Sequence, residues 1–151
     1  MFCFQCQETA KNSGCTVKGV CGKREETADL QDLLIYLCKG ISIYGEKLKE
    51  KGTLDKDVGR FVCEALFTTI TNVAWDDDVI IDRIKQAIEV RDTVREKLGG
   101  DDSNALPDCA TWSSDDKEEI VAKALSDEVR ITAVQNEDVR SLRELLVIGS
   151  K

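Results

Sequence analysis

Residues 27–51, TADLQDLLIYLCKGISIYGEKLKEK, decide the fold of this chain. Apolar side chains recur in them every three or four residues, which is the period of one face of an α-helix. They are Leu30, Leu33, Leu34, Leu37, Ile41, Tyr44 and Leu48. Lysines fill the last turns and Gly52 follows, as is common where a helix ends. The stretch therefore predicts a long amphipathic helix that packs its apolar face against other elements.

Two more amphipathic runs follow and supply packing partners. The first spans residues 58–75, and its apolar face consists of Val58, Phe61, Val62, Ala65, Leu66, Thr69 and Val73. The second opens with Asp76–Asp78, which offer an N-cap and an acidic first turn, and stops at Gly99 and Gly100. Three helices with short connections predict an antiparallel three-helix bundle over residues 27–100.

Residues 101–135 are predicted to connect this bundle to the last segment. They contain Pro107 in a polar loop. Ser113 or Ser114 is then placed to cap a shorter helix that ends near Leu125, and residues 129–134 are a candidate strand or extended linker. One proline, few aromatic residues and many Leu, Ile, Glu and Lys residues make an all-α fold the prediction for the whole chain.

The last segment, residues 136–151, repeats the beginning of the first predicted helix. At one constant offset, Leu30, Leu33, Leu34, Ile35 and Lys39 correspond to Leu142, Leu145, Leu146, Val147 and Lys151. One interpretation is the start of a second, related and truncated helical bundle. The other is chance similarity between two amphipathic helices. On the first interpretation, the chain stops inside a helix whose apolar face has no partner.

A cysteine-rich segment, residues 1–26, precedes the first helix. Its four cysteines, Cys3, Cys6, Cys15 and Cys21, have the spacing C-x2-C-x8-C-x5-C. Four thiolates are the usual ligand set of one [4Fe–4S] or [2Fe–2S] cluster. Three glycines, at positions 14, 19 and 22, allow the chain to wrap closely around such a group. Residues 1–24 hold three lysines and one arginine against a single acid, Glu8, and this locally cationic stretch would offset the negative charge of a thiolate-bound cluster.

Zinc is the alternative for these four cysteines, because four thiolates also form tetrahedral structural zinc sites. A zinc module commonly uses two C-x2-4-C steps, whereas Cys15 and Cys21 are separated by five residues. The spacing therefore favours a single iron–sulfur cluster, with one [4Fe–4S] cluster predicted and [2Fe–2S] or zinc as alternatives. A two-cluster ferredoxin pattern is excluded, since no further C-x2 step is present.

The other three cysteines are not predicted to be ligands. Cys38 and Cys63 lie beside apolar positions of predicted helices, where a free cysteine usually acts as a small buried apolar residue. Cys109, near Pro107, is undecided. The chain has no histidine, and its acidic runs at Asp76–Asp78, Asp101–Asp102 and Asp115–Asp116 are explained as helix caps. No catalytic residue is predicted.

Composition excludes several classes of function. A formal charge of −8 disfavours binding to nucleic acid or to anionic membranes. No apolar run is long enough for a membrane span, and the amino terminus does not have the pattern of a secretion signal. Seven cysteines without such a signal indicate metal or redox use in the reducing cytoplasm rather than a disulfide scaffold.

Matches to a known protein family begin at Met1–Thr9 and continue through Gly14–Thr16, Gly19–Lys23, Glu25–Thr27, Leu30–Leu34, Tyr44–Leu48, Thr69–Asn72, Trp75–Asp77, Ala110–Trp112 and Asn136–Leu146. In these residues the chain closely resembles the hybrid-cluster (prismane) protein family. The resemblance covers essentially the whole chain and is weakest between residues 79 and 108. This resemblance implies that Cys3, Cys6, Cys15 and Cys21 hold the family's amino-terminal [4Fe–4S] cluster.

The same resemblance implies an iron–sulfur oxidoreductase of anaerobes that reduces hydroxylamine to ammonia or acts on nitric oxide. Electrons would come from a redox donor protein, a reductase or a ferredoxin-like protein, and pass to a hybrid Fe–S–O cluster where substrate is reduced. In the family, the ligands of that second cluster include a histidine and lie past the point that corresponds to Lys151. The helical domain of the family is built of two three-helix bundles. The remainder of a full-length chain is thus an expected partner.

Two hypotheses follow for the chain. In the first, it is the electron-transfer part of a hydroxylamine-reductase-type enzyme and lacks the catalytic hybrid-cluster site. In the second, it is a complete small protein, either a one-cluster electron carrier or a zinc-stapled helical binding module. Continuation of the coding sequence past Lys151 would distinguish them.

Overall fold

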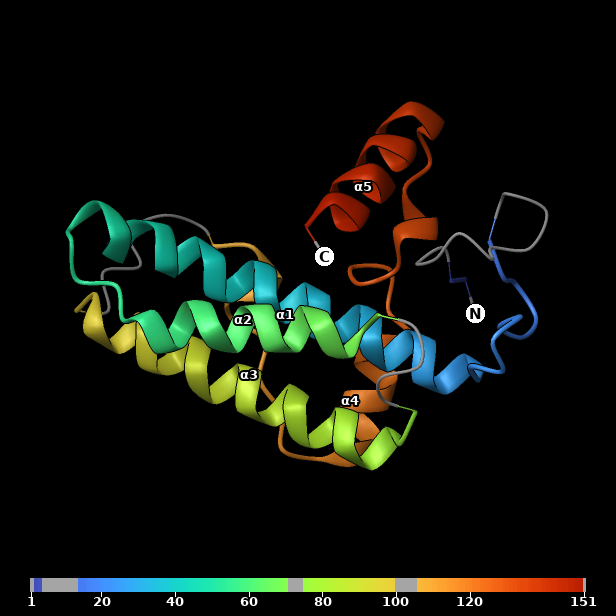
Figure 1. Cartoon of the computed structure of the whole chain (residues 1–151), viewed down its shortest axis with the longest axis horizontal. Helices are drawn as coiled ribbons and strands as arrows, with labels where there is room; N and C mark the ends of the chain where they lie inside the picture. The colour runs from blue at the N-terminus through green and yellow to red at the C-terminus, as the bar shows by residue number, and fades with distance from the viewer. Residues whose placement is uncertain (1, 4–13, 71–74, 100–105, 151) are drawn as a thin grey trace.

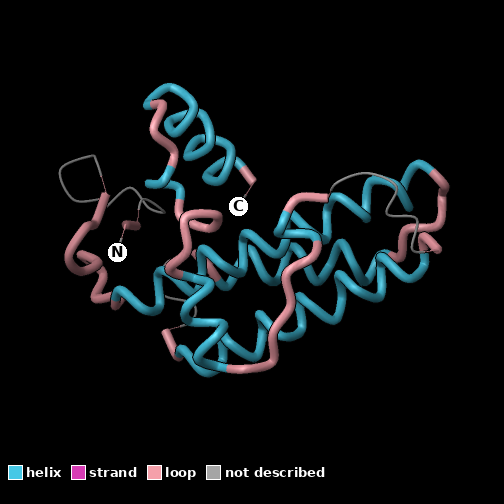
Figure 2. The backbone as a smooth tube through the Cα atoms, turned by 180° about the vertical axis from the view of Figure 1, so that it is seen from behind, coloured by secondary structure: helices cyan, strands magenta, loops and turns pink. Residues whose placement is uncertain are grey.

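The computed structural model of this chain describes residues 2–3, 14–70, 75–99 and 106–150. Its elements, in chain order, are α1 (Glu25–Glu50), α2 (Lys56–Thr68), α3 (Asp77–Lys97), η2 (Asp108–Ala110), α4 (Lys117–Ala124), η3 (Ile131–Ala133) and α5 (Glu137–Gly149), where η marks a 3-10 helix (Figure 1). The described residues form helices and loops, with one isolated β-bridge between Cys3 and Cys15 (Figure 2). The predicted all-α class is confirmed.

Helix α1 is the central element of the fold. It packs most extensively on α3, and also on η2, α4 and α2. Its side chains Leu33, Leu34 and Leu37 are completely buried, as the apolar period in residues 27–51 predicts. Helices α1, α2 and α3 run back and forth beside one another, and α4 follows behind them (Figure 1). None of the helices in the described ranges is long and apolar enough to cross a membrane.

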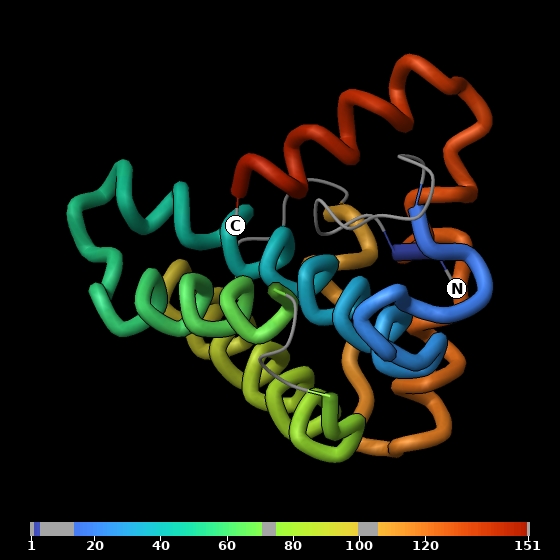
Figure 3. Tube along the Cα trace, turned by 45° about the vertical axis from the view of Figure 1, so that its right-hand side comes forward, coloured from blue at the N-terminus to red at the C-terminus, as the bar shows by residue number. Residues whose placement is uncertain are grey.

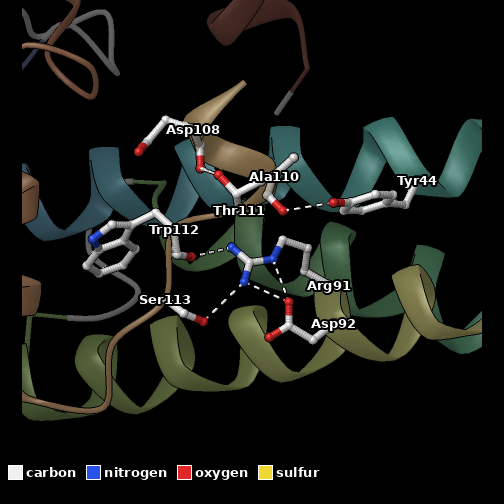
Figure 4. A network of polar contacts seen from close by, with 8 residues as sticks. All are labelled: Tyr44, Arg91, Asp92, Asp108, Ala110, Thr111, Trp112 and Ser113. Carbon is white, nitrogen blue, oxygen red and sulfur yellow. Dashed lines mark hydrogen bonds and ion pairs between the residues drawn. The ribbon is translucent and has the colours of Figure 1, made fainter. Parts of the chain in front are cut away.

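Residues 106–116, which precede α4, are held across α1 and α3 by polar contacts (Figure 4). Tyr44 of α1 donates a hydrogen bond to the Ala110 carbonyl at 3.0 Å. Arg91 of α3, only 1% exposed, donates to the Trp112 carbonyl and to Ser113 Oγ. Its guanidinium also pairs with Asp92. Burying a charged group is tolerated when its donors are satisfied in this way.

Three sequence predictions about element ends are corrected by the structure. Helix α2 ends at Thr68 rather than near Trp75, because Thr68 and Thr69 turn their hydroxyls back onto helix carbonyls in a run of β-branched residues. Asp116, not Ser113 or Ser114, is the N-cap of α4. Residues 129–134 contain the 3-10 helix η3 instead of a strand. Asp101 and Asp102 lie outside the described residues.

Helix α5 lies across α1 from α2 and α3 (Figures 1 and 3). Asn136 is its N-cap and accepts a hydrogen bond from the Val139 amide at 2.9 Å. None of its residues is buried, and it packs mainly on η3. Exposed apolar side chains line it: Val139, Leu142, Leu145, Leu146 and Ile148. The helix that was expected from residue 136 onward is therefore present, and most of its apolar surface is uncovered in this chain.

Candidate metal centre

Cys3 and Cys15 are paired through their backbones. The Cys3 amide donates to the Cys15 carbonyl at 3.0 Å, and the Cys15 amide donates to the Cys3 carbonyl at 2.7 Å. Residues paired reciprocally in an antiparallel bridge project their side chains to the same side, with Cα atoms about 5.5 Å apart. Both residues are buried, at 7% and 6% exposure. The fold thus brings two of the predicted ligands together.

Gly14 makes this pairing possible. Its φ of +128° is unfavourable for residues with a side chain. A Cβ on Gly14 would also stand 2.5 Å from Cε2 of the Phe2 ring. The glycine therefore lets Phe2 lie directly against the backbone next to the Cys3–Cys15 bridge.

Cys21 lies in a tight turn closed by backbone hydrogen bonds. The Gly22 amide donates to the Gly19 carbonyl at 2.8 Å, and the Gly19 amide donates to the Lys23 carbonyl at 3.0 Å. Gly22 has a φ of +94°, and a Cβ there would touch the Trp75 ring at 3.4 Å. Cys21 itself is half-buried. Its turn is therefore fixed in shape and lies against Trp75, which precedes the Asp76 cap of α3.

A second set of contacts anchors this segment to the amino-terminal end of α3. Arg24 pairs with Asp77, and the Thr27 hydroxyl donates to the other carboxylate oxygen of Asp77 at 2.6 Å. Asp76 caps α3 by accepting from the Asp78 amide at 3.0 Å. The prediction of an N-cap and acidic first turn is confirmed at Asp76–Asp78. The additional role of Asp77, joining the cysteine-rich segment to the bundle, has no local sequence signal.

Lys23 is the residue of this site that sequence reasoning did not single out. Its side chain is 1% exposed, and its Nζ donates to Gln31 Oε1 at 2.6 Å. Gln31 is fully buried and donates from Nε2 to the Thr68 carbonyl at 3.4 Å. Lys18 belongs to the same cysteine-rich segment, yet it is exposed.

The donor set fits a thiolate-held iron–sulfur group as far as the structure describes it. Cys3, Cys15 and Cys21 each offer a thiol sulfur, and soft sulfur ligands suit iron–sulfur clusters and zinc. Cys6 lies outside the described residues. Within the described ranges no three Cys, Asp or Glu side chains converge closely enough to hold a metal ion. The four-cysteine ligand set therefore stays a prediction.

The cysteines outside this segment have three different environments. Cys38 is buried in the core, as predicted, and burial raises its pKa to about 12. Cys109 is also buried, and burial raises its pKa. Cys63 is exposed, so the prediction of a buried residue is wrong there. Helix α2 buries only Ala65, and Cys63 lies on its outer face.

A polar cluster on α1, η2 and α4 is separate from the cysteine-rich segment. The Tyr36 hydroxyl donates to Asp108 Oδ2 at 2.8 Å, and Lys123 Nζ lies 2.6 Å from the same oxygen. Burial alone would raise the pKa of Asp108, but the hydrogen bonds from Lys123 and Tyr36 bring it below its ordinary value. The cluster joins three elements and contains the kinds of contacts that stabilise a fold.

Comparison with known proteins extends these observations. The family model described as Prismane/CO dehydrogenase family matches residues 1–151. A protein named hydroxylamine reductase from Desulfosudis oleivorans is 73% identical over 151 residues. Proteins of the same name from Halothermothrix orenii and Nitratidesulfovibrio vulgaris are 53% and 55% identical over 159 residues. Each alignment covers 100% of this chain and 28% of the relative.

The match includes the cysteine-rich segment, the bundle and α5, and it agrees with the resemblance carried by the residues around the four cysteines. This chain belongs to the Prismane/CO dehydrogenase family.

Proposed function

We propose that this chain is the electron-transfer part of an iron–sulfur oxidoreductase of the hydroxylamine reductase type. In this proposal Cys3, Cys6, Cys15 and Cys21 hold one [4Fe–4S] cluster. The observation that carries it is the reciprocal backbone pairing of Cys3 with Cys15, two buried cysteines, in a family whose relatives are named hydroxylamine reductase. When bound, the cluster supplies a centre that accepts and releases one electron.

The chain's own residues would keep the ligands in place during electron transfer. The Cys3–Cys15 bridge fixes two thiols relative to each other, and the turn from Gly19 to Lys23 fixes the third. Arg24 and Thr27, which follow this turn, tie it to α3 through Asp77. Ligands held by such outer contacts need little rearrangement when the charge of the centre changes.

The activity of the whole protein belongs to the proposal as well. We place reduction of hydroxylamine to ammonia, or chemistry on nitric oxide, at a hybrid Fe–S–O cluster in the remainder of a full-length chain. These 151 residues contain no histidine, a ligand of that cluster in the family they resemble. A redox donor protein, a reductase or a ferredoxin-like protein, would supply electrons in the cytoplasm, where thiols stay reduced.

Anaerobic loading of the chain with iron and sulfide tests the proposal. We expect a brown protein with about four iron and four sulfide per chain. Cys6→Ser and Cys15→Ser should each lose the cluster, whereas the matched change Cys63→Ser, at an exposed cysteine on α2, should keep it. A colourless protein with one bound zinc per chain would refute the iron–sulfur proposal and favour the zinc-stapled helical binding module. Equal loss of the cluster in all three variants would refute the division of the cysteines into ligands and non-ligands.

A further inference from the structure

Lys23 carries a buried positive charge without a carboxylate partner in the described part of the chain. Its side chain is 1% exposed, and its hydrogen bond is to a neutral amide oxygen, Oε1 of Gln31, at 2.6 Å. By contrast, Arg24 next to it pairs with Asp77 and is exposed. A buried ammonium is normally paired with an acid because removal from water is costly.

The surroundings of Lys23 show how the fold tolerates this charge. Gln31 passes the interaction on to the Thr68 carbonyl, in the last turn of α2. The carboxyl end of a helix bears a partial negative charge and favours a nearby cation. The ammonium is therefore stabilised by dipoles, which leave its full charge available to act on neighbouring groups.

Lys23 is also fixed close to a predicted ligand. It follows Cys21 by two residues, so the two Cα atoms are at most about 7.6 Å apart. The hydrogen bond from the Gly19 amide to the Lys23 carbonyl closes the turn that contains Cys21. Lysine and ligand thus belong to one tight backbone unit, and the lysine side chain extends from it into the protein interior.

We propose that the buried charge of Lys23 sets the reduction potential of the cluster, an inference that rests on the proposed [4Fe–4S] site. One electron from the redox donor makes the four-thiolate centre more negative by one charge, with no proton taken up. A fixed positive charge nearby stabilises that extra negative charge and favours the reduced form. Burial weakens screening by water and salt, so Lys23 should act far more strongly than the exposed Lys18.

A redox titration of the anaerobically loaded chain tests this inference. The electron paramagnetic resonance signal of the reduced cluster reports the reduced fraction at each potential. Lys23→Met keeps the length of the side chain and removes the charge. At a fixed solution potential, it should lower the ratio of reduced to oxidised cluster at least tenfold, which corresponds to about 59 mV for one electron. Lys18→Gln is the control for loss of a charge in the same segment and should leave the ratio nearly unchanged.

A second variant keeps the test decisive if Lys23→Met does not bind the cluster. Gln31→Glu preserves the side-chain size and pairs the ammonium with a carboxylate, so it should shift the ratio in the same direction as Lys23→Met. Lys23→Arg retains the charge and should stay near the wild-type value. An unchanged ratio of reduced to oxidised cluster in a cluster-loaded Gln31→Glu or Lys23→Met protein would overturn the proposed role of Lys23 and leave the proposed function standing. Wild-type protein that binds no iron–sulfur cluster would overturn the proposed function together with this inference.

Discussion

Gly40 of α1 and Cys109 of η2 meet backbone to backbone. A Cβ built on Gly40 would lie 2.7 Å from the Cys109 carbonyl carbon and still closer to its oxygen. The absence of a side chain at Gly40 thus lets the segment after α3 lie directly on the central helix. The same segment carries the contacts that Tyr44 and Arg91 make with its backbone.

This contact predicts that Gly40→Ala destabilises the fold although alanine is the better helix former. Overlap with rigid backbone should cost about 1–3 kcal/mol in the free energy of unfolding. Gly59→Ala is the matched control, since a Cβ on Gly59 meets nothing within 4 Å. That change should stabilise the protein by roughly 0.5–1 kcal/mol. Urea unfolding, monitored by circular dichroism, measures the free energy of unfolding of both variants. Equal changes in Gly40→Ala and Gly59→Ala would refute the close contact.

Asp77→Ala should loosen the cysteine-rich segment from the bundle. It removes the pair with Arg24 and the hydrogen bond from Thr27, and we expect a loss of about 1 kcal/mol in stability. The loaded protein should also release iron to a chelator faster than wild type, because its ligands are held less firmly. Asp57→Ala, in the first turn of α2 and paired with the exposed Arg60, should leave iron release unchanged.

The Asp108 cluster predicts a stability that falls at acidic pH. Burial raises the pKa of folded Asp108, but hydrogen bonds from Lys123 and Tyr36 outweigh it and hold that pKa below its ordinary value. The unfolded chain therefore binds the proton first, so the contribution of Asp108 is complete above pH of about 3.9 and is lost as pH falls through the folded pKa. Thermal unfolding of wild type and Asp108→Asn should differ at neutral pH and converge in acid. A gap that persists unchanged at pH values below the folded pKa of Asp108 would contradict this assignment.

Helix α5 should exchange its amide hydrogens much faster than α1. None of its residues is buried, and Leu146 is 72% exposed. Short helices without packing are marginally stable in water. Hydrogen exchange measured by mass spectrometry on a monomeric sample checks this expectation. Strong protection of residues 140–148 in such a sample would mean that the chain itself buries this helix.

The loaded chain should exchange electrons but should not reduce hydroxylamine. Cleavage of an N–O bond needs an open metal position and a proton donor, and the chain has no histidine to supply either. Incubation with reduced viologen and hydroxylamine under argon, with ammonia as the readout, tests this prediction against a Cys6→Ser control. Sustained turnover above that control would place a catalytic site at the amino-terminal cluster.

Features that depend on neighbouring residues were predictable from the sequence. The long helix at residues 27–51, the Asp76 cap and the start of α5 follow from apolar period and capping chemistry, both of which act within a few residues. The cysteine spacing likewise identifies four candidate ligands without any knowledge of the fold. At α4 two local signals compete: Ser113 or Ser114 was expected to cap the helix, and the run Asp115–Asp116 was also explained by capping. Asp116 is the N-cap.

Features that depend on contacts between distant segments were decided by the tertiary structure. Lys18 and Lys23 both lie in the cysteine-rich segment, but only Lys23 contacts Gln31 and is buried. Cys38 and Cys63 both lie in amphipathic helices, and only the first faces the core. The backbone pairing of Cys3 with Cys15 and the contact of Gly40 with Cys109 also join residues that no local pattern links. Burial and close approach are set by which surfaces pack together, and the periodicity of one segment does not contain that information.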